Sequence, residues 1–573
     1  MRVIWPYVRR HAGIATGAVI TTILQAATIL WQPFLLQKVL AAIIANHQGV
    51  VLNLGVQLLL VALLGIVAGI LNTVWAAQTA VRIAADMRAD LFQRVQRFAY
   101  ADIEQFSASS LGVRMTNDIN QVQMLVMSIL QIVLRVPITF VGALALAILA
   151  IPSLWWLLVV MIVVIGALGV FMTVKMGGYF GKIQHYIDEV NTIARENMMG
   201  ARVVKSFNQE DAQLGSFNQA SGQMETLSIK IGYAFAVMVP GFFMIANVVV
   251  GIAVLMIGNQ ITSHPAYLAV ITSFVGYVLQ ILYAFMNAAF IATGATRAFV
   301  SLGRIGEVLR HAPSMLFPNQ APVLSLDGGI DLRDVTFTYP GDDAPILQHV
   351  NFKVRPGEML GIVGATGSGK STLAQLLGRL FDPDEGAVMV GGHDLRELNP
   401  RSIRKAVAVV LQRSTLFSGT IASNLRQVRP DATTADMEWA AKIAQAAEFI
   451  DQLPERFDAP VDERAANFSG GQKQRLSITR GLIGQPAVLV LDDATSALDA
   501  RSEKRVQEAL ARDLGHMTTV IIAEKISSVM HADRILVMDH GRVVGNGTHA
   551  ELSATNKAYQ TILNSQRSAE EVG

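Results

Sequence analysis

The chain has 573 residues, of which 52% are hydrophobic and only 16% are charged. Soluble globular proteins carry about a quarter charged residues, so part of this chain is expected to lie in a lipid bilayer. The net charge of +2 gives no reason to expect a nucleic-acid partner, and the lack of cysteine excludes disulfides, thiolate metal sites and cysteine nucleophiles.

The N-terminal segment, MRVIWPYVRRH, predicts a helix at the membrane interface. Trp5 and Tyr7 suit the headgroup level, and Arg9 and Arg10 suit its cytosolic side. A cleaved signal peptide is not expected, because the apolar stretch that follows is too long and no small-residue cleavage site ends it.

Four regions without charged residues predict six membrane-spanning helices, since one helix needs about 20 residues to cross the hydrocarbon core. Regions 12–37 and 50–81 each match one helix. The other two regions are long enough for two helices each and contain breaks. Region 136–174 is divided at Ile151-Pro152-Ser153, and region 231–296 at Gly258-Asn259-Gln260 and Ser263-His264-Pro265.

The distribution of Lys and Arg predicts the orientation of these spans. The turns near 46–50, 151–153 and 259–265 contain neither residue, whereas 82–123, 175–230 and the chain after 296 are rich in both. By the positive-inside rule, those basic segments and both termini are cytosolic. Segments 82–123 and 175–230 keep a helical pattern, so the spanning helices are expected to continue past the membrane.

The composition changes after the last span. Residues 311–325 are punctuated by proline and predict a linker. Apolar runs of strand length then alternate with helical patterns, which predicts an α/β domain with a mainly parallel sheet. These runs are VTFTY, MLGIVG, AVAVVLQ, AVLVLD, TVIIAE and RILVM. We therefore expect an all-α transmembrane domain at 1–310, a linker at 311–325 and an α/β domain at 326–573.

The segment GATGSGKS, residues 364–371, fits the phosphate-binding pattern G-x-x-x-x-G-K-[ST] between a predicted strand and a predicted helix. Backbone N–H groups of such a loop close around phosphates, and the helix N-terminus favours their negative charge. Lys370 is expected to reach the β- and γ-phosphates of ATP, and Ser371 to bind Mg²⁺. The expected nucleotide-binding residues here are Gly364, Thr366, Gly367, Ser368, Gly369, Lys370, Ser371 and Thr372.

A second acidic strand, VLVLD, ends at Asp492. Four apolar residues followed by a carboxylate have the form of a Walker B element, whose aspartate belongs to the Mg²⁺ shell. Asp492 is therefore expected to bind the metal and the nucleotide together with the phosphate-binding loop.

Between these two motifs, Ser469-Gly470-Gly471-Gln472 resembles the LSGGQ signature of the ATP-binding cassette (ABC) transporter family, with Phe468 in the leucine position. The resemblance covers the whole chain. It implies that Tyr339 stacks on adenine, that Gln412 is the glutamine linking the nucleotide and Mg²⁺ to the membrane domain, and that Asp499 belongs to the D-loop. Six spans followed by one cassette are similar to exporter-type half-transporters, which work as dimers.

Two positions depart from the family's pattern, and both concern hydrolysis. Asp493 stands where the catalytic glutamate is usual, and its shorter side chain misplaces the carboxylate by about an ångström, which can cost on the order of 10² in rate. Glu524 stands where a histidine is usual; when ionised it offers no donor and repels phosphate. The resemblance thus implies an ATP- and Mg²⁺-binding site that hydrolyses slowly.

In the family, each ATP lies between one chain's Walker motifs and the partner's signature. This resemblance implies that the chain completes its partner's site with five residues, which are Ser469, Gly470, Gly471, Gln472 and Asp499. Two copies of the chain would make two poor sites, so we expect a heterodimer with a second half-transporter that supplies the glutamate and the histidine. A homodimer that tolerates Asp493 is the alternative.

The central stretches of the predicted spans carry no Lys, Arg, Asp or Glu and contain many Met and Phe residues. A highly charged solute is therefore poorly supported, whereas adaptable apolar surfaces suit varied ligands. We expect an exporter of hydrophobic or amphiphilic compounds, such as drugs, in the cytoplasmic membrane of a bacterium. A lipid or lipopeptide flippase, an ATP-sensing regulatory subunit and a metal-chelate importer are the alternatives.

Overall fold

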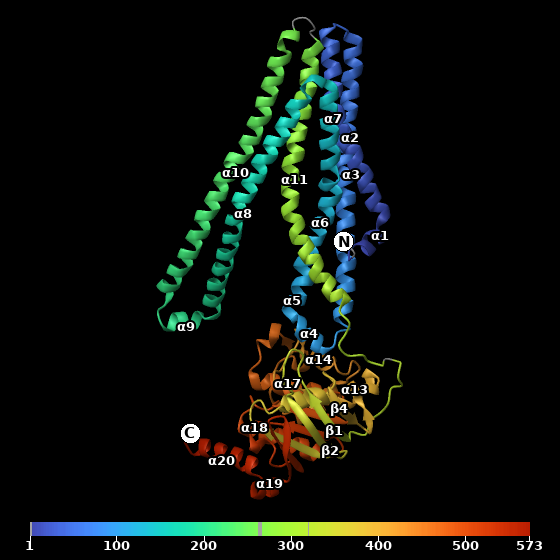
Figure 1. The fold of residues 1–573 in the computed structure, drawn as a ribbon. Coiled ribbons are helices and arrows are strands. Elements are labelled where there is room, and N and C mark those ends of the chain that lie inside the picture. Colours follow the sequence, from blue (N-terminus) through green and yellow to red (C-terminus); the bar gives the residue numbers. More distant parts are fainter. Residues whose placement is uncertain (1–2, 262–265, 319, 573) are drawn as a thin grey trace. The chain divides into compact units, whose positions relative to one another are not determined.

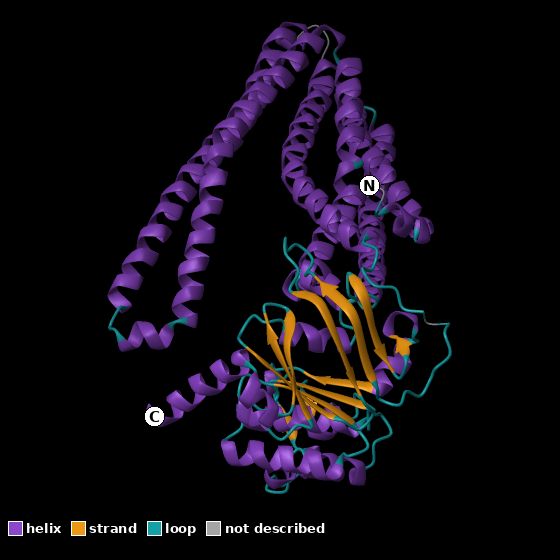
Figure 2. Ribbon diagram, turned by 60° about the horizontal axis from the view of Figure 1, so that its bottom comes forward, coloured by secondary structure: helices purple, strands orange, loops and turns teal. Residues whose placement is uncertain are grey.

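The computed structural model describes residues 3–261, 266–318 and 320–572. The chain forms two compact units. The helical unit consists of Met1–Gln93 and Gly112–Arg310, and the α/β unit consists of Arg94–Leu111 and His311–Gly573. Helices make up the first unit, while the second combines helices with β-sheets (Figure 2).

Within the described residues, six helical segments are long and apolar enough to cross a membrane, which confirms the predicted number of spans. The helices of this part of the chain are labelled in Figure 1. They are α1 (Trp5–Arg10), α2 (Ala12–Ile44), α3 (Gln48–Val95), α4 (Tyr100–Phe106), α5 (Ala108–Val113), α6 (Ile119–Ser128), α7 (Arg135–Ala150), α8 (Trp155–Met199), α9 (Ala201–Ser206), α10 (Glu210–Ile261) and α11 (Ala266–Arg310). The π-helical turns η1 (Arg114–Asp118) and η2 (Ile129–Val133) and the 3₁₀ turn η3 (Pro152–Leu154) complete the set.

The long helices continue well past the length of one span, as the sequence predicts. Helices α3, α8 and α10 have 48, 45 and 52 residues, against the roughly 20 that a bilayer requires. The predicted break at 151–153 coincides with η3. The predicted break at Gly258-Asn259-Gln260 is wrong, because these residues still belong to α10, which ends at Ile261. The other predicted break, Ser263-His264-Pro265, lies outside the described residues.

Pro33 shapes the contact between α2 and α11. Because proline has no backbone N–H, the carbonyl of Ile29 loses its partner within the helix. Gln280 of α11 replaces that partner, and its Nε2 donates to the Ile29 carbonyl at 2.9 Å. Tyr277 donates to the next carbonyl, that of Leu30, at 3.3 Å. Side chains of α11 therefore compensate for the proline in α2.

A buried polar network joins α2, α3 and η2. The side chain of Asn72 donates to Thr22 Oγ1 at 2.6 Å and to the Ala18 carbonyl at 2.9 Å. Thr22 in turn donates to the carbonyl of Leu130 in η2 at 2.6 Å. A π-helical turn shifts the backbone bonding pattern, and these side chains supply Leu130 with a donor from outside its own segment.

Two ion pairs tie η1 to the C-terminal part of α11. Asp118 is fully buried and accepts hydrogen bonds from Ser301 Oγ at 2.8 Å and from Arg304 Nη2 at 2.5 Å. Arg114 pairs with Glu307 at 2.8 Å. A buried carboxylate with charged and neutral donors is strongly held, so these contacts fix the third span against the sixth.

The α/β unit contains a six-stranded sheet in the order β12-β11-β3-β10-β9-β6. All neighbouring pairs are parallel except β11 with β12, which confirms the predicted mainly parallel sheet. The strands are β3 (Met359–Gly364), β6 (Val407–Val410), β9 (Val488–Asp492), β10 (Thr518–Ile522), β11 (Arg534–Asp539) and β12 (Arg542–Gly547). Every residue of β9 and β10 is buried, as expected for central parallel strands.

A second, antiparallel sheet has the order β2-β1-β4-β5. It consists of β1 (Ile330–Phe337), β2 (Leu347–Val354), β4 (Glu385–Val390) and β5 (His393–Asp394). The predicted strand VTFTY, residues 335–339, overlaps the last three residues of β1 and therefore lies outside the parallel sheet. Apolar alternation indicates a strand but does not specify the strand with which it pairs. The sequence pattern therefore did not predict this antiparallel sheet.

The remaining elements of the α/β unit surround these sheets. The helices are α12 (Lys370–Leu377), α13 (Pro400–Ala406), α14 (Ile421–Leu425), α15 (Thr434–Ile443), α16 (Ala447–Ile450), α17 (Gly470–Ile483), α18 (Ala500–Asp513), α19 (His549–Thr555) and α20 (Lys557–Val572). The 3₁₀ turns are η4 (Leu395–Glu397), η5 (Arg456–Asp458), η6 (Glu463–Ala465) and η7 (Ile526–Ser528), and β7 (Gly419–Thr420) pairs with β8 (Pro460–Val461).

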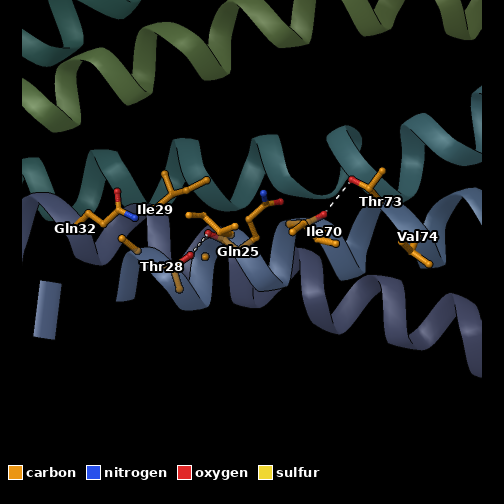
Figure 3. A pocket seen from close by; sticks show the side chains of 11 residues that line it. Gln25, Thr28, Ile29, Gln32, Ile70, Thr73 and Val74 are labelled. Carbon is orange, nitrogen blue, oxygen red and sulfur yellow. Dashed lines mark hydrogen bonds between the residues drawn. The ribbon is translucent and has the colours of Figure 1, made fainter. Parts of the chain in front are cut away.

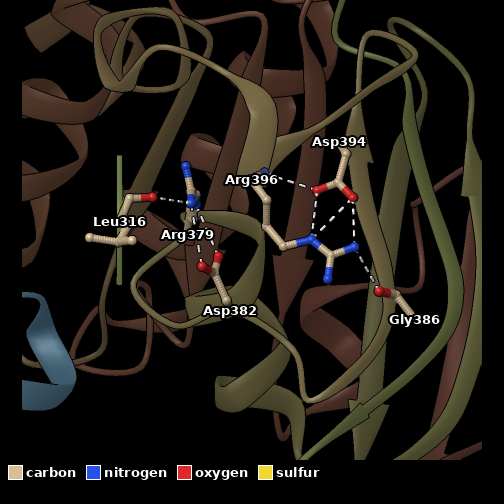
Figure 4. A network of polar contacts seen from close by, with 6 residues as sticks. All are labelled: Leu316, Arg379, Asp382, Gly386, Asp394 and Arg396. Carbon is tan, nitrogen blue, oxygen red and sulfur yellow. Dashed lines mark hydrogen bonds and ion pairs between the residues drawn. The ribbon is translucent and has the colours of Figure 1, made fainter. Parts of the chain in front are cut away.

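Within this unit, two arginines form charged contacts that hold the segment predicted as a linker and the antiparallel sheet in place. Arg379 pairs with Asp382 at 2.9 Å and also donates to the carbonyl of Leu316 (Figure 4). Arg396 pairs with Asp394 at 2.7 Å and donates to the Gly386 carbonyl (Figure 4). Arg379 thereby holds Leu316, in the segment predicted as a linker, beside the helix that follows the phosphate-binding loop.

Helix α4 belongs to the α/β unit although it follows the second span in the chain. The ring of Tyr100 meets Phe381 edge-on at 5.7 Å. Asp102 is buried and accepts hydrogen bonds from Ala99 N, Ser314 N and, at 2.9 Å, His311. Burial opposes ionisation of Asp102, but these donors outweigh it and lower the pKa of its carboxyl.

Candidate nucleotide site

The predicted phosphate-binding loop connects β3 with α12, so that the chain turns sharply between Gly364 and Lys370. Gly367 and Gly369 have φ angles of +82° and +95°, a region that favours glycine. A Cβ on Gly369 would also lie 2.6 Å from Leu347 Cδ2. Both constraints explain why glycine stands at the N-cap of α12.

A cavity of about 220 Å³ opens above this loop. Its described lining combines the loop with the ends of β9 and β10 and with the segment after β6. The lining residues are Ile346, Thr366, Gly367, Gly369, Lys370, Ser371, Thr372, Gln412, Asp492, Asp493, Ile522, Ala523 and Glu524. Most of the predicted nucleotide and catalytic residues thus lie around one cavity.

Lys370 and Ser371 start α12 and point their polar atoms at the loop and at β9. Lys370 Nζ donates to the carbonyls of Gly364 and Ala365, each at 2.8 Å. Burial lowers the pKa of Lys370, and the surrounding carboxylates oppose that shift. Ser371 Oγ donates to Asp492 Oδ1 at 3.0 Å. The serine hydroxyl and the aspartate therefore lie within hydrogen-bond distance of each other.

Asp492 is buried at the end of β9. Burial raises the pKa of its carboxyl and nearby Asp493 adds to the rise, while Ser371 and Lys370 oppose it. A hydroxyl and a carboxylate at this spacing are oxygen ligands of the kind that Mg²⁺ prefers. The oxygen atoms of Ser371 and Asp492 thus fit a site that would hold a magnesium ion.

Asp493 follows the strand with a φ of +48°, which brings its backbone into the left-handed region that aspartate tolerates better than most residues. Its Oδ2 accepts a hydrogen bond from Gln412 Nε2 at 2.9 Å. Burial raises the pKa of Asp493, the hydrogen bonds from Ser496 and Gln412 lower it, and Glu524 and Glu503 raise it. In this arrangement the amide nitrogen of Gln412 faces Asp493.

Glu524 lies just beyond β10, on the other side of the cavity. Its Oε1 accepts a hydrogen bond from Thr366 Oγ1 in the phosphate-binding loop at 3.0 Å. The described lining therefore holds three carboxylates, Asp492, Asp493 and Glu524, against the single ammonium of Lys370. This charge balance favours a cation beside any bound triphosphate.

Tyr339 does not line the cavity but is fixed next to it. Its hydroxyl contacts Thr372 Oγ1 at 3.0 Å and donates to Gln375 Oε1 at 2.9 Å. Its ring meets Phe337 and Phe381 edge-on, and burial raises the pKa of the phenol. The predicted adenine-stacking ring thus stands beside the first turn of α12.

The signature residues also lie outside this cavity. Ser469 is the N-cap of α17, and Ser469 and Gln472 bond each other's backbone N–H groups, which is a capping box. A Cβ on Gly471 would lie 3.1 Å from the carbonyl oxygen of Ala497, so the signature packs against the D-loop. Phe468, in the leucine position, is buried.

Other predicted residues have roles in the fold. The side chain of Asp499 caps α18 by accepting from Ser502 N at 2.9 Å. Gly364 ends β3, and Ser368 is buried behind the loop. Ile346, Ile522 and Ala523 line the cavity without having been predicted. Ile522 and Ala523 belong to the predicted strand TVIIAE, which ends at Glu524. Nothing in the local sequence marks Ile346.

Fold and site together define a membrane-spanning protein that carries one nucleotide-binding cassette. Comparison with known families agrees: residues 16–295 match the ABC transporter transmembrane region, and residues 347–496 match the ABC transporter domain. The chain belongs to the ABC transporter family, and it has an ABC ATP-binding domain.

Individual relatives extend this result over almost the whole chain. The uncharacterized ABC transporter ATP-binding protein YfiB of Bacillus subtilis is 33% identical over 564 residues, covering 98% of this chain and 97% of YfiB. The ATP-dependent lipid A-core flippase of Aromatoleum aromaticum is 33% identical over 504 residues, covering 86% and 82%. A solved bacterial Atm1-family ABC exporter with ATP bound shares the fold, with a TM-score of 0.77, 23% identity and 98% of each chain covered.

Proposed function

We propose that this chain is one half of a heterodimeric ABC exporter, holding Mg²⁺-ATP in its own Walker site and hydrolysing it there slowly. The observation that carries the proposal is the position of Glu524, whose carboxylate is hydrogen-bonded to Thr366 of the phosphate-binding loop at 3.0 Å. A carboxylate at that point accepts hydrogen bonds rather than donating them, and it repels a γ-phosphate.

Asp493 also supports slow hydrolysis at this chain's Walker site. Its carboxylate is shorter by one methylene than the usual glutamate, and it is already engaged by Gln412. A general base must lie within hydrogen-bond reach of the water that it activates. A carboxylate that is withdrawn from the phosphate and held by an amide meets that requirement poorly, so ATP stays bound for longer than at an ordinary site.

The residue types that are needed to bind ATP and Mg²⁺ are present at this site. Lys370 supplies the positive charge for the phosphates, and Ser371 and Asp492 would hold Mg²⁺. When bound, the metal would neutralise part of the charge of the phosphates. We propose nucleotide contacts for the remaining predicted residues as well, including Tyr339 for the adenine.

The signature of this chain would serve the partner's ATP. Ser469, Gly470 and Gly471 lie at the N-terminus of the 14-residue helix α17, where free backbone N–H groups favour a phosphate. With Gln472 and Asp499, these residues would complete a site in which the partner supplies the glutamate and the histidine. Hydrolysis at that site would reset the dimer.

We propose the cytoplasmic membrane of a bacterium as the location, with both termini and the cassette in the cytosol. The membrane domain of residues 1–310 would move a hydrophobic or amphiphilic compound outward, and the linker of 311–325 would join it to the nucleotide-binding domain of 326–573. A lipid flippase is the second candidate, which the similarity to the lipid A-core flippase favours. Transport of labelled lipid against transport of drug-like dyes separates the two.

The heterodimer is tested with the purified chain, alone and together with the half-transporter encoded beside it. We expect the pair to hydrolyse ATP many times faster than this chain alone. In the pair, Asp493→Asn in this chain should reduce turnover far less than removal of the partner's catalytic glutamate. Full activity of the chain alone, or equal losses from the two substitutions, would overturn the proposal.

A further inference from the structure

An open groove of about 550 Å³ lies between α2 and α3 (Figure 3). Its α2 side consists of Gln25, Thr28, Ile29 and Gln32, which stand at helical spacing on one face. Its α3 side consists of Ala62, Gly65, Ile66, Gly69, Ile70, Thr73 and Val74. The groove thus combines amide and hydroxyl groups with an apolar wall inside two membrane-spanning helices.

Two glycines on α3 make room for the polar groups. A Cβ on Gly69 would lie 2.7 Å from Gln25 Nε2, and a Cβ on Gly65 would lie 2.9 Å from Thr28 Oγ1. Either would force the α2 side chains to move. Glycine at both positions therefore lets the amide and the hydroxyl lie directly against the backbone of α3.

The amide groups of the groove retain free hydrogen-bonding capacity. Thr28 and Thr73 donate to carbonyls of their own helices, those of Gln25 and Gly69. The amide N–H groups of Gln25 and Gln32, in contrast, have no hydrogen-bond acceptor among the residues that the structure describes. Unpaired donors exposed to lipid tails are costly, so these amide groups are suited to hydrogen-bond a polar group that enters the groove.

Arg135 contacts one lining residue of the groove, because its Nη1 donates to Gln25 Oε1 at 3.3 Å. It is the first residue of α7, which has 16 residues and ends at Ala150. At 1.5 Å per residue, Arg135 lies about 22 Å along the helix from that end, within the roughly 30 Å of hydrocarbon.

Within the described part of the chain, Arg135 forms no ion pair with a carboxylate. Its hydrogen-bond partner is the neutral amide oxygen of Gln25. Arginines at membrane depth normally pair with an anion or mark a substrate path. A guanidinium also offers a planar set of donors that matches the oxygens of a carboxylate or phosphate.

We propose that this groove binds the anionic head group, a carboxylate or phosphate, of the amphiphile that the transporter moves. Arg135 and the amides of Gln25 and Gln32 would hold the head group, and Ile66, Ile70 and Val74 would contact the apolar body. The inference rests on the proposed export function and names the substrate class: an amphiphilic anion rather than a cationic drug.

The test uses the full-length chain in phosphatidylcholine nanodiscs without nucleotide. Dodecyl phosphate and dodecyltrimethylammonium have the same tail and opposite head charges, and calorimetric titration of each is corrected with empty discs. We expect tighter binding of dodecyl phosphate, a loss of tenfold or more in Arg135→Gln, and a smaller loss in Arg135→Lys. Lys38→Gln is the matched control, because Lys38 is a cation of α2, the helix that carries Gln25, and lies beside the ring of Phe34 rather than in the groove. This variant should bind as the native chain does.

Equal affinity of native chain and Arg135→Gln for dodecyl phosphate, or equal affinity for both probes, would overturn the inference. If Arg135→Gln does not fold, as judged by its thermal midpoint and ATP binding, Gln32→Leu provides the same comparison at the edge of the groove. ATP-driven movement by the assembled pair is measured separately in proteoliposomes. Movement that does not depend on Arg135 refutes the inference but leaves the proposed function, whereas Arg135-dependent binding without movement refutes the proposed function.

Discussion

The carboxylate of Glu524 and the hydroxyl of Thr366 are joined by a hydrogen bond of 3.0 Å. The two residues are 158 positions apart, and the parallel pairing of β3 with β10 brings the strand end before Glu524 next to the loop that contains Thr366. A negative charge is thereby held at the phosphate-binding loop. Glu524 can only accept hydrogen bonds when ionised, whereas a histidine at this position could donate one to the γ-phosphate.

Glu524→Gln should strengthen ATP binding. The substitution removes one negative charge next to the triphosphate, while the amide oxygen still accepts from Thr366. We expect about a tenfold gain in Mg²⁺-ATP affinity, which corresponds to about 1.4 kcal/mol. A fluorescent ATP analogue titrated into the purified full-length chain measures this gain.

Glu508→Gln is the matched control, because Glu508 is exposed on α18 and its ion pair with Lys504 is long, at 3.9 Å. It should bind ATP as the native chain does. An unchanged or weaker affinity in Glu524→Gln would show that this carboxylate does not face the nucleotide.

Gly369→Ala should abolish nucleotide binding. Alanine at a φ of +95° costs about 1–2 kcal/mol, and its Cβ would also press against Leu347. The loop must therefore distort, and we expect both loss of ATP binding and a lower thermal midpoint. Gly515→Ala is the control, since a Cβ there meets nothing within 4 Å; a similar loss from both substitutions contradicts this account.

Gln280→Leu should destabilise the helical unit only while Pro33 is present. In the native chain it leaves the Ile29 carbonyl without its donor, at a cost of about 0.6–1.7 kcal/mol for a hydrogen bond between membrane helices. Pro33→Ala restores the backbone donor of α2. A double-mutant cycle read by SDS unfolding should therefore show coupling, and additive effects would refute the compensation.

The sequence predicts local parts of the site well. The spacing from Gly364 to Ser371 determines the loop by itself, and the loop, β3 and α12 all lie where the sequence expects them. The run of four apolar residues before Asp492 likewise predicts a buried strand that ends at this residue, and β9 confirms it. Such features depend on neighbours in the chain, so no knowledge of the fold is needed to locate them.

Contacts between distant segments could not be predicted in this way. The bonds of Gln412 to Asp493 and of Thr366 to Glu524 join different strand ends, and strand order is not visible in a local pattern. Arg135 is different, because a signal existed. The charge-free residues 136–150 are fewer than the roughly 20 that one span needs, and the third candidate span, Ala108–Ala150, accordingly contains Arg135.

The measurement that tests the central claim most directly compares ATP hydrolysis by the native chain and by Asp493→Glu/Glu524→His. Both are purified at full length and reconstituted in nanodiscs, alone and with the neighbouring half-transporter whose catalytic glutamate has been removed. In that pair, this chain's Walker site is the one left to hydrolyse ATP. At saturating Mg²⁺-ATP we predict equal ATP occupancy and a rate at least about 100-fold higher for the double substitution. A native chain that hydrolyses ATP as fast as the double variant would contradict the claim that this site holds ATP rather than consuming it.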